Sequence, residues 1–452
     1  MNFLAFDIGT SFIKGAVLNA DTFQIDHVQR APFPEPIPNL PPTLCEIEPY
    51  KIIDATRELI ARLGPYAPDC EGVVMSGQMQ GLVLTDECAT PLSNYISWRD
   101  QRALMPHPSG ETYFEKLMAH ISSDERRQMG SELRASLPVC ALYWLNEQRQ
   151  LPRQVVPSSL ADFVISNLCG TTPTIEPTNA SVHGVLNLET QDWHWKVIDK
   201  LGLADLSFPK LRHTGEIVGY LDLNGKRVPC YTPLGDQPTA LVGALLQEGE
   251  LSINISTGSQ VALLSPHLAF GNYQTRPFFD GRFLNLITHI PAGRALTALV
   301  NLLTEISPTD DPWDYIIPTA ENVRETDLRV NLAFFTSVCG DRGAIENMRE
   351  ENLTIGHVFR AAFENMAQNY FLGARRLSPE RAWNKIVFSG GLAQKIELLR
   401  RLIAEKFDLA YRIAPSSEDT LLGLLLLARV FSGREKSVAQ AVTHHLSRLE
   451  VL

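Results

Sequence analysis

The stretch FLAFDIGTSFIKGAVL, at residues 3–18, decides the fold. Residues 3–6 form a short apolar run typical of a buried strand, and the polar turn Asp7-Ile8-Gly9-Thr10-Ser11 follows it. A second β-prone run occupies residues 12–18. The pattern predicts a strand, a tight glycine-containing turn and a returning strand.

A similar unit recurs in the second half of the chain. Residues 251–255 are β-prone, Ser256-Thr257-Gly258-Ser259 form a turn, and residues 260–264 return. Two such hairpins indicate an internal duplication. Because 452 residues exceed one ordinary core, we predict an α/β protein with one domain at 1–234 and another at 235–452.

Periodicity places further elements around the hairpins. Apolar residues at helical spacing predict helices over 52–63, 354–377, 394–407 and 418–431. Short β-prone runs predict strands at 72–76 and 385–388, which lead into Gly77-Gln78-Met79-Gln80-Gly81 and Ser389-Gly390-Gly391. Both glycine-containing segments therefore follow the ends of strands.

Composition narrows the class of protein. Hydrophobic residues make up 44% and charged residues 20%, as in folded globular proteins. The formal charge of −11 and the lack of a basic run argue against nucleic acid as a partner. The seven scattered cysteines form no CxxC pair, and the apolar stretch at 421–428 is too short to span a bilayer. With no signal-peptide pattern at the amino terminus, we expect a cytoplasmic protein that does not bind a membrane.

The two turns carry the residue types that phosphate chemistry requires. Phosphoryl transfer needs backbone donors around the phosphates, a carboxylate-held Mg²⁺ and a proton acceptor. Asp7, Gly9, Thr10 and Ser11 offer such groups, and Thr257-Gly258-Ser259 repeat the donors. Each turn alone is compatible with an ordinary hairpin. No GxxxxGK[ST] loop and no GxGxxG motif is present.

Asp236 is the candidate general base. It lies in Gly235-Asp236-Gln237-Pro238, just before the apolar residues 240–246 that predict a helix. An aspartate at that position is also typical of a helix N-cap, which contributes about 1 kcal/mol. The local sequence leaves both interpretations open.

The complete set of motifs resembles the FGGY carbohydrate kinases. It comprises Asp7-Ile8-Gly9-Thr10, Gly77-Gln78-Met79-Gln80-Gly81, Trp98-Arg99-Asp100-Gln101-Arg102, Thr178-Asn179-Ala180-Ser181, Gly235-Asp236-Gln237, Ser256-Thr257-Gly258-Ser259 and Ser389-Gly390-Gly391. The order is that of the family, and the resemblance covers nearly the whole chain. It implies two actin-like ATPase (ribonuclease H-like) domains with an interdomain cleft, and ATP and Mg²⁺ as cofactors.

The resemblance also implies roles for individual residues. Asp236 matches the catalytic base, and Asp7 with Asp236 would lie near the metal. The expected cofactor-binding residues are Asp7, Gly9, Thr10, Ser11, Thr257, Gly258, Ser259, Gly390, Gly391 and Gly423. The expected substrate-binding residues are Gln78, Met79, Gln80, Trp98, Asp100, Arg102, Asp236 and Gln237.

The substrate is less sharply defined by the motifs. Asn254-Ile255-Ser256-Thr257 and the sequence IGHVFRA at 355–361 are similar to the sedoheptulokinase branch. Gln237 is similar to glycerol kinases, and Gly77-Gln78-Met79 to xylulokinases. Gln80 stands where xylulokinase-like members have His, and Pro291-Ala292-Gly293 stands where the sedoheptulokinase branch has Asn-Gly-Gly.

We therefore expect an ATP-dependent kinase for a small-molecule sugar, with a ketose such as sedoheptulose as substrate. Xylulose, glycerol or another polyol are the alternative substrates. A non-catalytic sugar-sensing protein of the same fold is the alternative function, and a homodimer is the assembly to test.

Overall fold

A computed structural model describes residues 2–303 and 311–451 of the chain. It divides into two compact units. The first comprises Met1–Leu245, Thr275–Phe283 and Glu418–Leu452, and the second comprises Leu246–Gln274 and Leu284–Ser417. This division differs from the predicted one, which placed a single boundary between residues 234 and 235 and so put residues 418–452 in the second domain. The carboxyl-terminal helices return to the first unit because one of them, α14, packs on its sheet and on helix α8.

The first unit is built on a sheet with the strand order β13-β14-β5-β1-β2-β3, and β15 also pairs with β5. Strands β1 and β2 are antiparallel, with Ile8 opposite Ile13, while β5 and β15 run parallel to the strands beside them. The bounds are β1 (Asn2–Ile8), β2 (Phe12–Asn19), β3 (Gln24–Pro32), β5 (Cys70–Gly77), β13 (Ile217–Leu223), β14 (Lys226–Tyr231) and β15 (Leu234–Gly235). The predicted first hairpin is confirmed.

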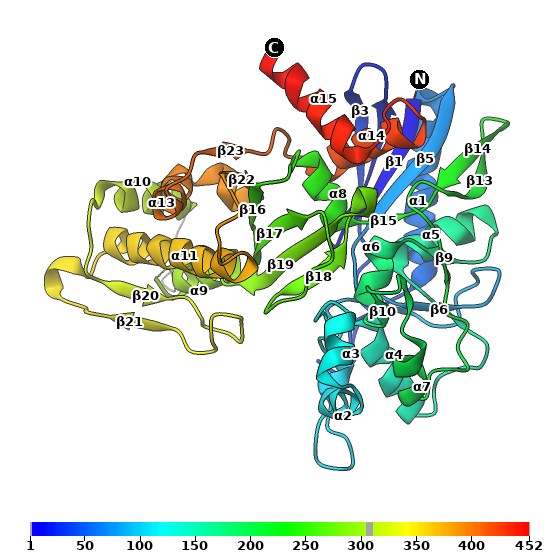
Figure 1. Cartoon of the computed structure of the whole chain (residues 1–452), viewed down its shortest axis with the longest axis horizontal. Helices are drawn as coiled ribbons and strands as arrows, with labels where there is room; N and C mark the ends of the chain where they lie inside the picture. Colours follow the sequence, from blue (N-terminus) through cyan, green and yellow to red (C-terminus); the bar gives the residue numbers. More distant parts are fainter. Residues whose placement is uncertain (1, 304–310, 452) are drawn as a thin grey trace. The chain divides into compact units, whose positions relative to one another are not determined.

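Helices pack on both faces of this sheet, and alternate side chains of β1 point to opposite faces. Leu4, Phe6 and Ile8 point into a core shared with α1 (Pro49–Leu63) and α5 (Leu160–Cys169). The alternating residues, which include Asp7, point to the opposite face. There α14 (Asp419–Phe431) contacts β1 and β5 and crosses α8 (Asp236–Gly243), as Figure 1 shows.

A second sheet has the order β18-β19-β17-β16-β22-β23, in which β23, β22, β16, β17 and β19 correspond to β14, β5, β1, β2 and β3. The edge strands β13 and β18 have no counterparts. Strands β16 and β17 form the second predicted hairpin, and β22 lies parallel to β16 just as β5 lies parallel to β1. The bounds are β16 (Glu250–Ile255), β17 (Ser259–Ser265), β18 (Gln274–Pro277), β19 (Phe283–Ile290), β22 (Lys385–Ser389) and β23 (Tyr411–Ile413). Two sheets that share the order of five strands are what the sequence duplication predicts.

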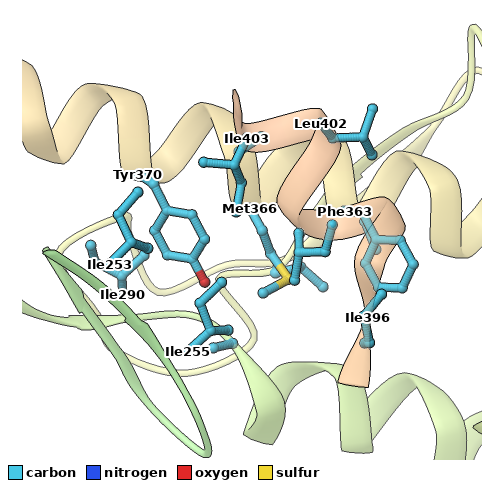
Figure 2. Close-up of a cluster of buried hydrophobic side chains, with 14 of the residues drawn as sticks. Ile253, Ile255, Ile290, Phe363, Met366, Tyr370, Ile396, Leu402 and Ile403 are labelled. Atoms are coloured by element: carbon cyan, nitrogen blue, oxygen red, sulfur yellow. The ribbon is translucent and has the colours of Figure 1, made fainter. Parts of the chain in front are cut away.

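The core of the second unit is formed by its sheet and several helices. Figure 2 shows Ile253 and Ile255 of β16 and Ile290 of β19 near Met366 and Tyr370 of α11 (Ile355–Leu377). The predicted helix over 394–407 is instead two helices, α12 (Gly391–Lys395) and α13 (Glu397–Phe407). Ile396 breaks the helix because its backbone is extended (φ −109°, ψ 94°) and its side chain is buried in this core.

The remaining elements are mostly short. In the first unit they are β4 (Glu46–Ile47), β6 (Val83–Thr85), β7 (Tyr95–Ile96), α2 (Tyr113–His120), α3 (Ser123–Gln128), α4 (Pro138–Glu147), β8 (Val156–Ser158), β9 (Thr174–Ile175), α6 (Pro177–Ala180), β10 (Leu186–Asn187), β11 (Asp192–Trp193), α7 (Trp195–Lys200), β12 (Lys210–Leu211) and α15 (Val438–Val451). In the second unit they are α9 (Gly293–Leu303), α10 (Trp313–Asn322), β20 (Arg329–Asn331) and β21 (Ala344–Glu346). Among the described helices, none has the length and apolarity needed to cross a membrane.

Candidate active site

Three parallel strands of the first unit end side by side. Gly77 of β5 pairs with Ile8 of β1 on one side and with Gly235 of β15 on the other. The residues that follow these strands are Gly9, Gln78 and Asp236, so their backbones lie along one edge of the sheet. In open α/β sheets, ligands bind outside the carboxyl ends of the strands. Three predicted motifs, far apart in the sequence, therefore meet at an edge suited to a ligand.

The turn of the first hairpin is closed tightly. The N–H of Gly9 donates to the carbonyl of Phe12 at 3.0 Å, and a Cβ at Gly9 would lie 3.0 Å from the same oxygen. The Gln78 side chain fastens this turn to β5 because its Nε2 donates to the carbonyl of Gly9 at 3.3 Å. Thr10 is half-buried and Ser11 exposed. The turn thus presents polar groups beyond the end of the sheet.

Asp7 lies on β1 just before this turn, buried on the face that α14 covers. The hydroxyl of Ser76 donates to its Oδ1 at 3.0 Å. Burial raises the pKa of Asp7 to about 6, and the carboxylates of Asp419 and Glu418 act in the same direction. Ser76 and Lys14 oppose that rise. This carboxylate is poorly neutralised by its protein surroundings.

Asp236 is the first residue of α8 and is half-buried. The N-cap is Gly235, so the structure does not give Asp236 the N-cap position that the sequence left open. Its Oδ1 accepts from the N–H of Gln237 at 2.8 Å. Burial raises the pKa of Asp236 to about 7, the charge of Asp7 adds to the rise, and the cation of Arg276 opposes it. A carboxyl with this pKa can take up a proton near neutral pH.

The two carboxylates fit a weakly held divalent cation. Asp7 raises the pKa of Asp236 by repulsion, and a cation beside them would relieve it. Within residues 2–303 and 311–451 no group of three or more His, Cys, Asp or Glu side chains could hold a metal. Mg²⁺ is commonly held by one or two carboxylates, with water and phosphate oxygens as its other ligands. Asp7 and Asp236 are the donors such an ion would find here.

The predicted sugar-facing segment 98–102 divides into exposed and buried parts. The indole of Trp98 is 38% exposed, and its Nε1 donates to the hydroxyl of Thr10 at 3.2 Å. Asp100 and Arg102 are buried against each other, with Arg102 Nε 2.8 Å from Asp100 Oδ1. Arg102 also pairs with Glu46 at 2.6 Å. Of the three predicted sugar contacts in this segment, Trp98 is the one with an exposed side chain, while Asp100 and Arg102 are buried.

Of the predicted sugar-facing residues after β5, Met79 is buried and Gln80 is half-buried. Met79 is buried, and a Cβ at Gly235 would lie 2.9 Å from its sulfur, so Met79 packs beneath the turn before Asp236. Gln80 is half-buried in the left-handed region, with φ of 72°. Its side chain makes no hydrogen bond within the described part of the chain. The side-chain amide of Gln80 is therefore not engaged in holding its own turn.

A buried cation next to Asp236 was missed by the sequence analysis. Arg276 is 5% exposed, and its Nη1 donates to the Oε1 of Gln237. Its Nε and Nη2 donate to the two carboxylate oxygens of Glu132 at 2.6 and 3.1 Å. The available signal was one arginine within the β-prone run YQTRPFF at 273–279. No local pattern connects that run with Gln237.

In the second unit, β16 and β22 end side by side, with Asn254 opposite Ser389. Thr257 and Gly258 are exposed in the turn after β16. The hydroxyl of Ser259 is instead buried against the hydroxyl of Tyr370 at 2.8 Å, so Ser259 is held in the core. This end of the sheet therefore presents Thr257 and Gly258 rather than the Ser259 side chain.

The glycine pair after β22 lies at the same edge. Gly390 has φ of +88°, and a Cβ there would lie 2.5 Å from the carbonyl of Ile255. Gly391 opens α12 and is exposed, with nothing within 4 Å of an added Cβ. Glycine at 390 is required by the backbone, whereas Gly391 leaves open space at the start of a helix.

Gly423 lies in the first unit, unlike the two glycines with which it was grouped. It is buried in α14, and a Cβ there would come within 1.9 Å of the carbonyl of Thr239 on α8. A Cβ at Gly243 of α8 would come within 1.7 Å of the carbonyl of Asp419 on α14. Gly423 therefore allows two helices to cross closely. Its predicted contact with adenosine stays a prediction.

Comparison with known proteins agrees with this geometry. Residues 2–243 match the profile of the FGGY family of carbohydrate kinases, N-terminal domain. The chain is similar to human sedoheptulokinase, at 22% identity over 96% of this chain and 98% of that protein. The fold is also that of xylulose kinase from Lactobacillus acidophilus, with a TM-score of 0.85, 18% identity and coverage of 97% and 91%. It likewise matches Plasmodium falciparum glycerol kinase with ADP, with a TM-score of 0.84, 17% identity and coverage of 98% and 92%.

Two duplicated sheets, each with a polar turn after its first strand, define the class of two-domain actin-like ATPase folds. The chain belongs to the FGGY family of carbohydrate kinases. It is an ATP-dependent sugar kinase, as the sequence predicted.

Proposed function

We propose that this kinase transfers the γ-phosphoryl group of ATP to a hydroxyl of a ketose, with sedoheptulose as the first candidate. The similarity to human sedoheptulokinase over nearly the full length of both chains supports this choice. The observation that carries the chemistry is Asp236. It is a half-buried carboxyl with a pKa of about 7, on the strand edge that also bears the Gly9 turn.

Asp236 would act as the general base. As the sugar oxygen attacks the γ-phosphorus, its proton passes to the Asp236 carboxylate, and the bond from the γ-phosphorus to the bridging oxygen of ADP breaks. The pKa near 7 keeps a large share of Asp236 ionised at neutral pH while leaving it basic enough to accept that proton. Its place at the start of α8 favours the ionised form further.

Each unit, taken by itself, carries groups that suit a nucleotide. The backbone N–H groups and hydroxyls of Thr10 and Ser11 suit phosphate oxygens, as do Thr257 and Gly258. The exposed start of α12 at Gly391 leaves room for adenosine. Asp7, with Asp236 beside it, would hold Mg²⁺, which supplies positive charge to the phosphates when bound.

The sugar would meet polar side chains of the segments around Asp236. We assign this role to the amides of Gln78, Gln80 and Gln237 and to the indole of Trp98. The Oε1 of Gln78 is buried and accepts no hydrogen bond from the described residues, so a sugar hydroxyl would satisfy it. Met79, Asp100 and Arg102 are assigned to holding these side chains in position.

A coupled ADP-release assay with a panel of sugars tests the proposal. Sedoheptulose, xylulose, gluconate and glycerol are compared at equal ATP, with a no-sugar control. The proposal requires the highest kcat/KM for the seven-carbon ketose. A higher value for xylulose or glycerol would replace the substrate, and sugar binding without ADP release from any member would replace the enzyme by a sensor.

A further inference from the structure

We propose that Thr178 is a positioning residue for the candidate base Asp236, and that the buried carboxylate of Glu176 orients the Thr178 hydroxyl for this role. Thr178 begins the segment TNAS at 178–181, which matches the family and has no role in the proposed function. The inference rests on the proposed function, in which Asp236 accepts the proton. It adds a residue that acts on Asp236 through the preceding backbone.

The hydroxyl of Thr178 holds the residue just before Asp236. The N–H of Gly235 donates to Thr178 Oγ1 at 3.1 Å. The carbonyl of the same glycine accepts from Thr239 Oγ1 at 2.8 Å. Gly235 is the buried N-cap of α8, and a buried N–H without an acceptor is costly. Thr178 therefore fixes the backbone at which α8 begins, and Asp236 is the first residue of that helix.

The strand β15 depends on such contacts because it is short. It comprises only Leu234 and Gly235, which pair with β5. Helix α6 contacts β15, and Asn179 Nδ2 of α6 donates to the carbonyl of Pro233 at 3.4 Å. Two neighbouring residues of one motif thus fasten the segment that leads into Asp236.

The direction of the Thr178 hydroxyl is set by Glu176. A hydroxyl has one hydrogen to donate and two lone pairs that accept. The hydroxyl of Thr178 donates to Glu176 Oε2, which also accepts from the N–H of Thr178 at 2.8 Å. A lone pair of Thr178 Oγ1 is therefore left for the N–H of Gly235. Without an acceptor at position 176, the hydroxyl hydrogen could turn toward Gly235, where two donors would meet.

Glu176 is itself held in place as an acceptor. It is the N-cap of α6, is 1% exposed, and accepts from the Thr214 hydroxyl through its Oε1 at 2.6 Å. Burial raises the pKa of Glu176, while the hydrogen bonds from Thr178 and Thr214 lower it. The donors around this carboxylate therefore favour its ionised form, which is the form that orients Thr178.

The decisive variant is Thr178→Val, which keeps the shape of the side chain and removes the acceptor for Gly235. Its kinetics are measured by ADP release with the sugar that the wild-type protein prefers. The kcat should fall by about 10–100-fold, because a small displacement of a catalytic group is costly. The KM for ATP should stay unchanged, since the exposed turns after β1 and β16 are not altered.

Two further variants separate positioning from a loss of stability. Thr178→Ser keeps the hydroxyl and should restore kcat close to that of wild type. Thr56→Val is the matched control, because Thr56 is fully buried in α1 and its hydroxyl donates to the carbonyl of Ile52 at 2.8 Å. It should lower Tm as Thr178→Val does and leave kcat unchanged.

The pH profile gives a readout that a loss of stability alone would not move. Without Thr178 as an acceptor, the start of α8 loosens and Asp236 gains contact with water. The rise of kcat/KM with pH should therefore shift to lower pH by about half a unit or more, because burial is what raises the pKa of Asp236. In the described residues, the titratable and charged side chains that act on Asp236 are Asp7, Arg276 and Tyr95, and Thr178→Val changes none of them.

The outcomes separate this inference from the proposed function. If Asp236→Asn keeps the kcat of wild type, the proposed function fails and this inference fails with it. If Asp236→Asn is inactive but folded Thr178→Val keeps the kcat or the pH profile of wild type, the proposed function stands and the positioning role is wrong. Equal losses of kcat in Thr178→Val and Thr56→Val would also overturn the inference.

Should Thr178→Val not fold, Thr178→Cys decides alone. A thiol is a weak acceptor of a size close to that of the hydroxyl, so this variant should lower kcat and shift the pH profile in the same direction. A wild-type kcat and pH profile in Thr178→Cys would overturn the inference.

Discussion

At the scale of single residues, Asp236 carries the strongest prediction. Asp236→Asn should lower kcat by about 10²–10⁴-fold, since an amide cannot accept the proton, while sugar affinity changes little. In the wild-type protein, kcat/KM should rise with pH through about 7 as Asp236 of the free enzyme ionises. Initial rates from pH 5 to 9, with sugar affinity by calorimetry, check both statements. A kcat within threefold or so of wild type would remove Asp236 from the mechanism.

The same substitution should stabilise the ligand-free protein. The pKa of Asp236 is raised on folding, so the native state binds the proton more tightly than the unfolded chain, and stability is lost as pH rises from about 4 to 7. A tenfold difference in proton affinity between the native and unfolded states corresponds to about 1.4 kcal/mol. Asp236→Asn removes this cost at neutral pH. Its Tm should exceed that of wild type at pH 8 and match it near pH 4, by calorimetry without Mg²⁺.

Asp7 is predicted to act on the nucleotide side. Asp7→Asn removes the charge but keeps a side-chain oxygen. The hydroxyl of Ser76, which donates to Asp7 Oδ1 in the wild-type protein, can donate to that oxygen. The Mg²⁺ concentration required for half-maximal rate should rise by about tenfold or more, because one of two carboxylate ligands is lost. The sugar KM should stay within about twofold, a difference near the noise of such measurements. A change in the KM for the sugar alone, with an unchanged Mg²⁺ requirement, would show that Asp7 does not bind the metal.

At the scale of elements, the crossing of α8 and α14 positions the active-site edge. Gly243 and Gly423 bring the two helices into backbone contact, and α8 begins at Asp236. Gly423→Ala should force the helices apart, because its Cβ would meet the Thr239 carbonyl at 1.9 Å. Overpacking typically costs about 1–3 kcal/mol.

The measurements for Gly423→Ala are Tm and kcat, with Gly433→Ala as a control outside the crossing. Gly433 has open space around its Cβ but φ of +73°, so it reports backbone strain without a clash. The crossing variant should lose more kcat than the control at matched stability. Equal behaviour of the two variants would show that the crossing does not hold Asp236 in place.

At the scale of the whole molecule, each unit has an exposed turn whose role in phosphate binding can be tested by itself. Ser11 and Thr257 are exposed turn residues, one in each unit, and neither is needed for core packing. Ser11→Ala and Thr257→Ala should each raise the KM for ATP by about tenfold or more, since a hydrogen bond to a charged group contributes a net of about 1.5–3 kcal/mol. Sugar KM should not follow. An effect from one unit alone would show that the other turn does not bind phosphate.

Local sequence was enough to determine the two hairpins, the strands β5 and β22 and the helices α1, α11 and α14, because alternating and helical periodicities report which face of an element is buried. The motif turns after β1 and β16 were found for the same reason, since Gly9 and Gly258 mark the ends of buried strands. Gly235 and Asp236 were also correctly placed at the start of a helix.

Only the tertiary structure shows which residues far apart in the sequence contact one another. The return of residues 418–452 to the first unit depends on the contact of α14 with α8, which no local pattern encodes. The pairing of Asp100 with Arg102 buries both side chains, whereas Trp98 of the same motif is exposed, and their predicted contacts with the sugar stay predictions. Arg276 donates a hydrogen bond to Gln237, although the two residues are 39 positions apart in the chain. Burial, charge pairing and backbone contact act between residues that the fold brings together, whereas periodicity reports only the neighbours along the chain.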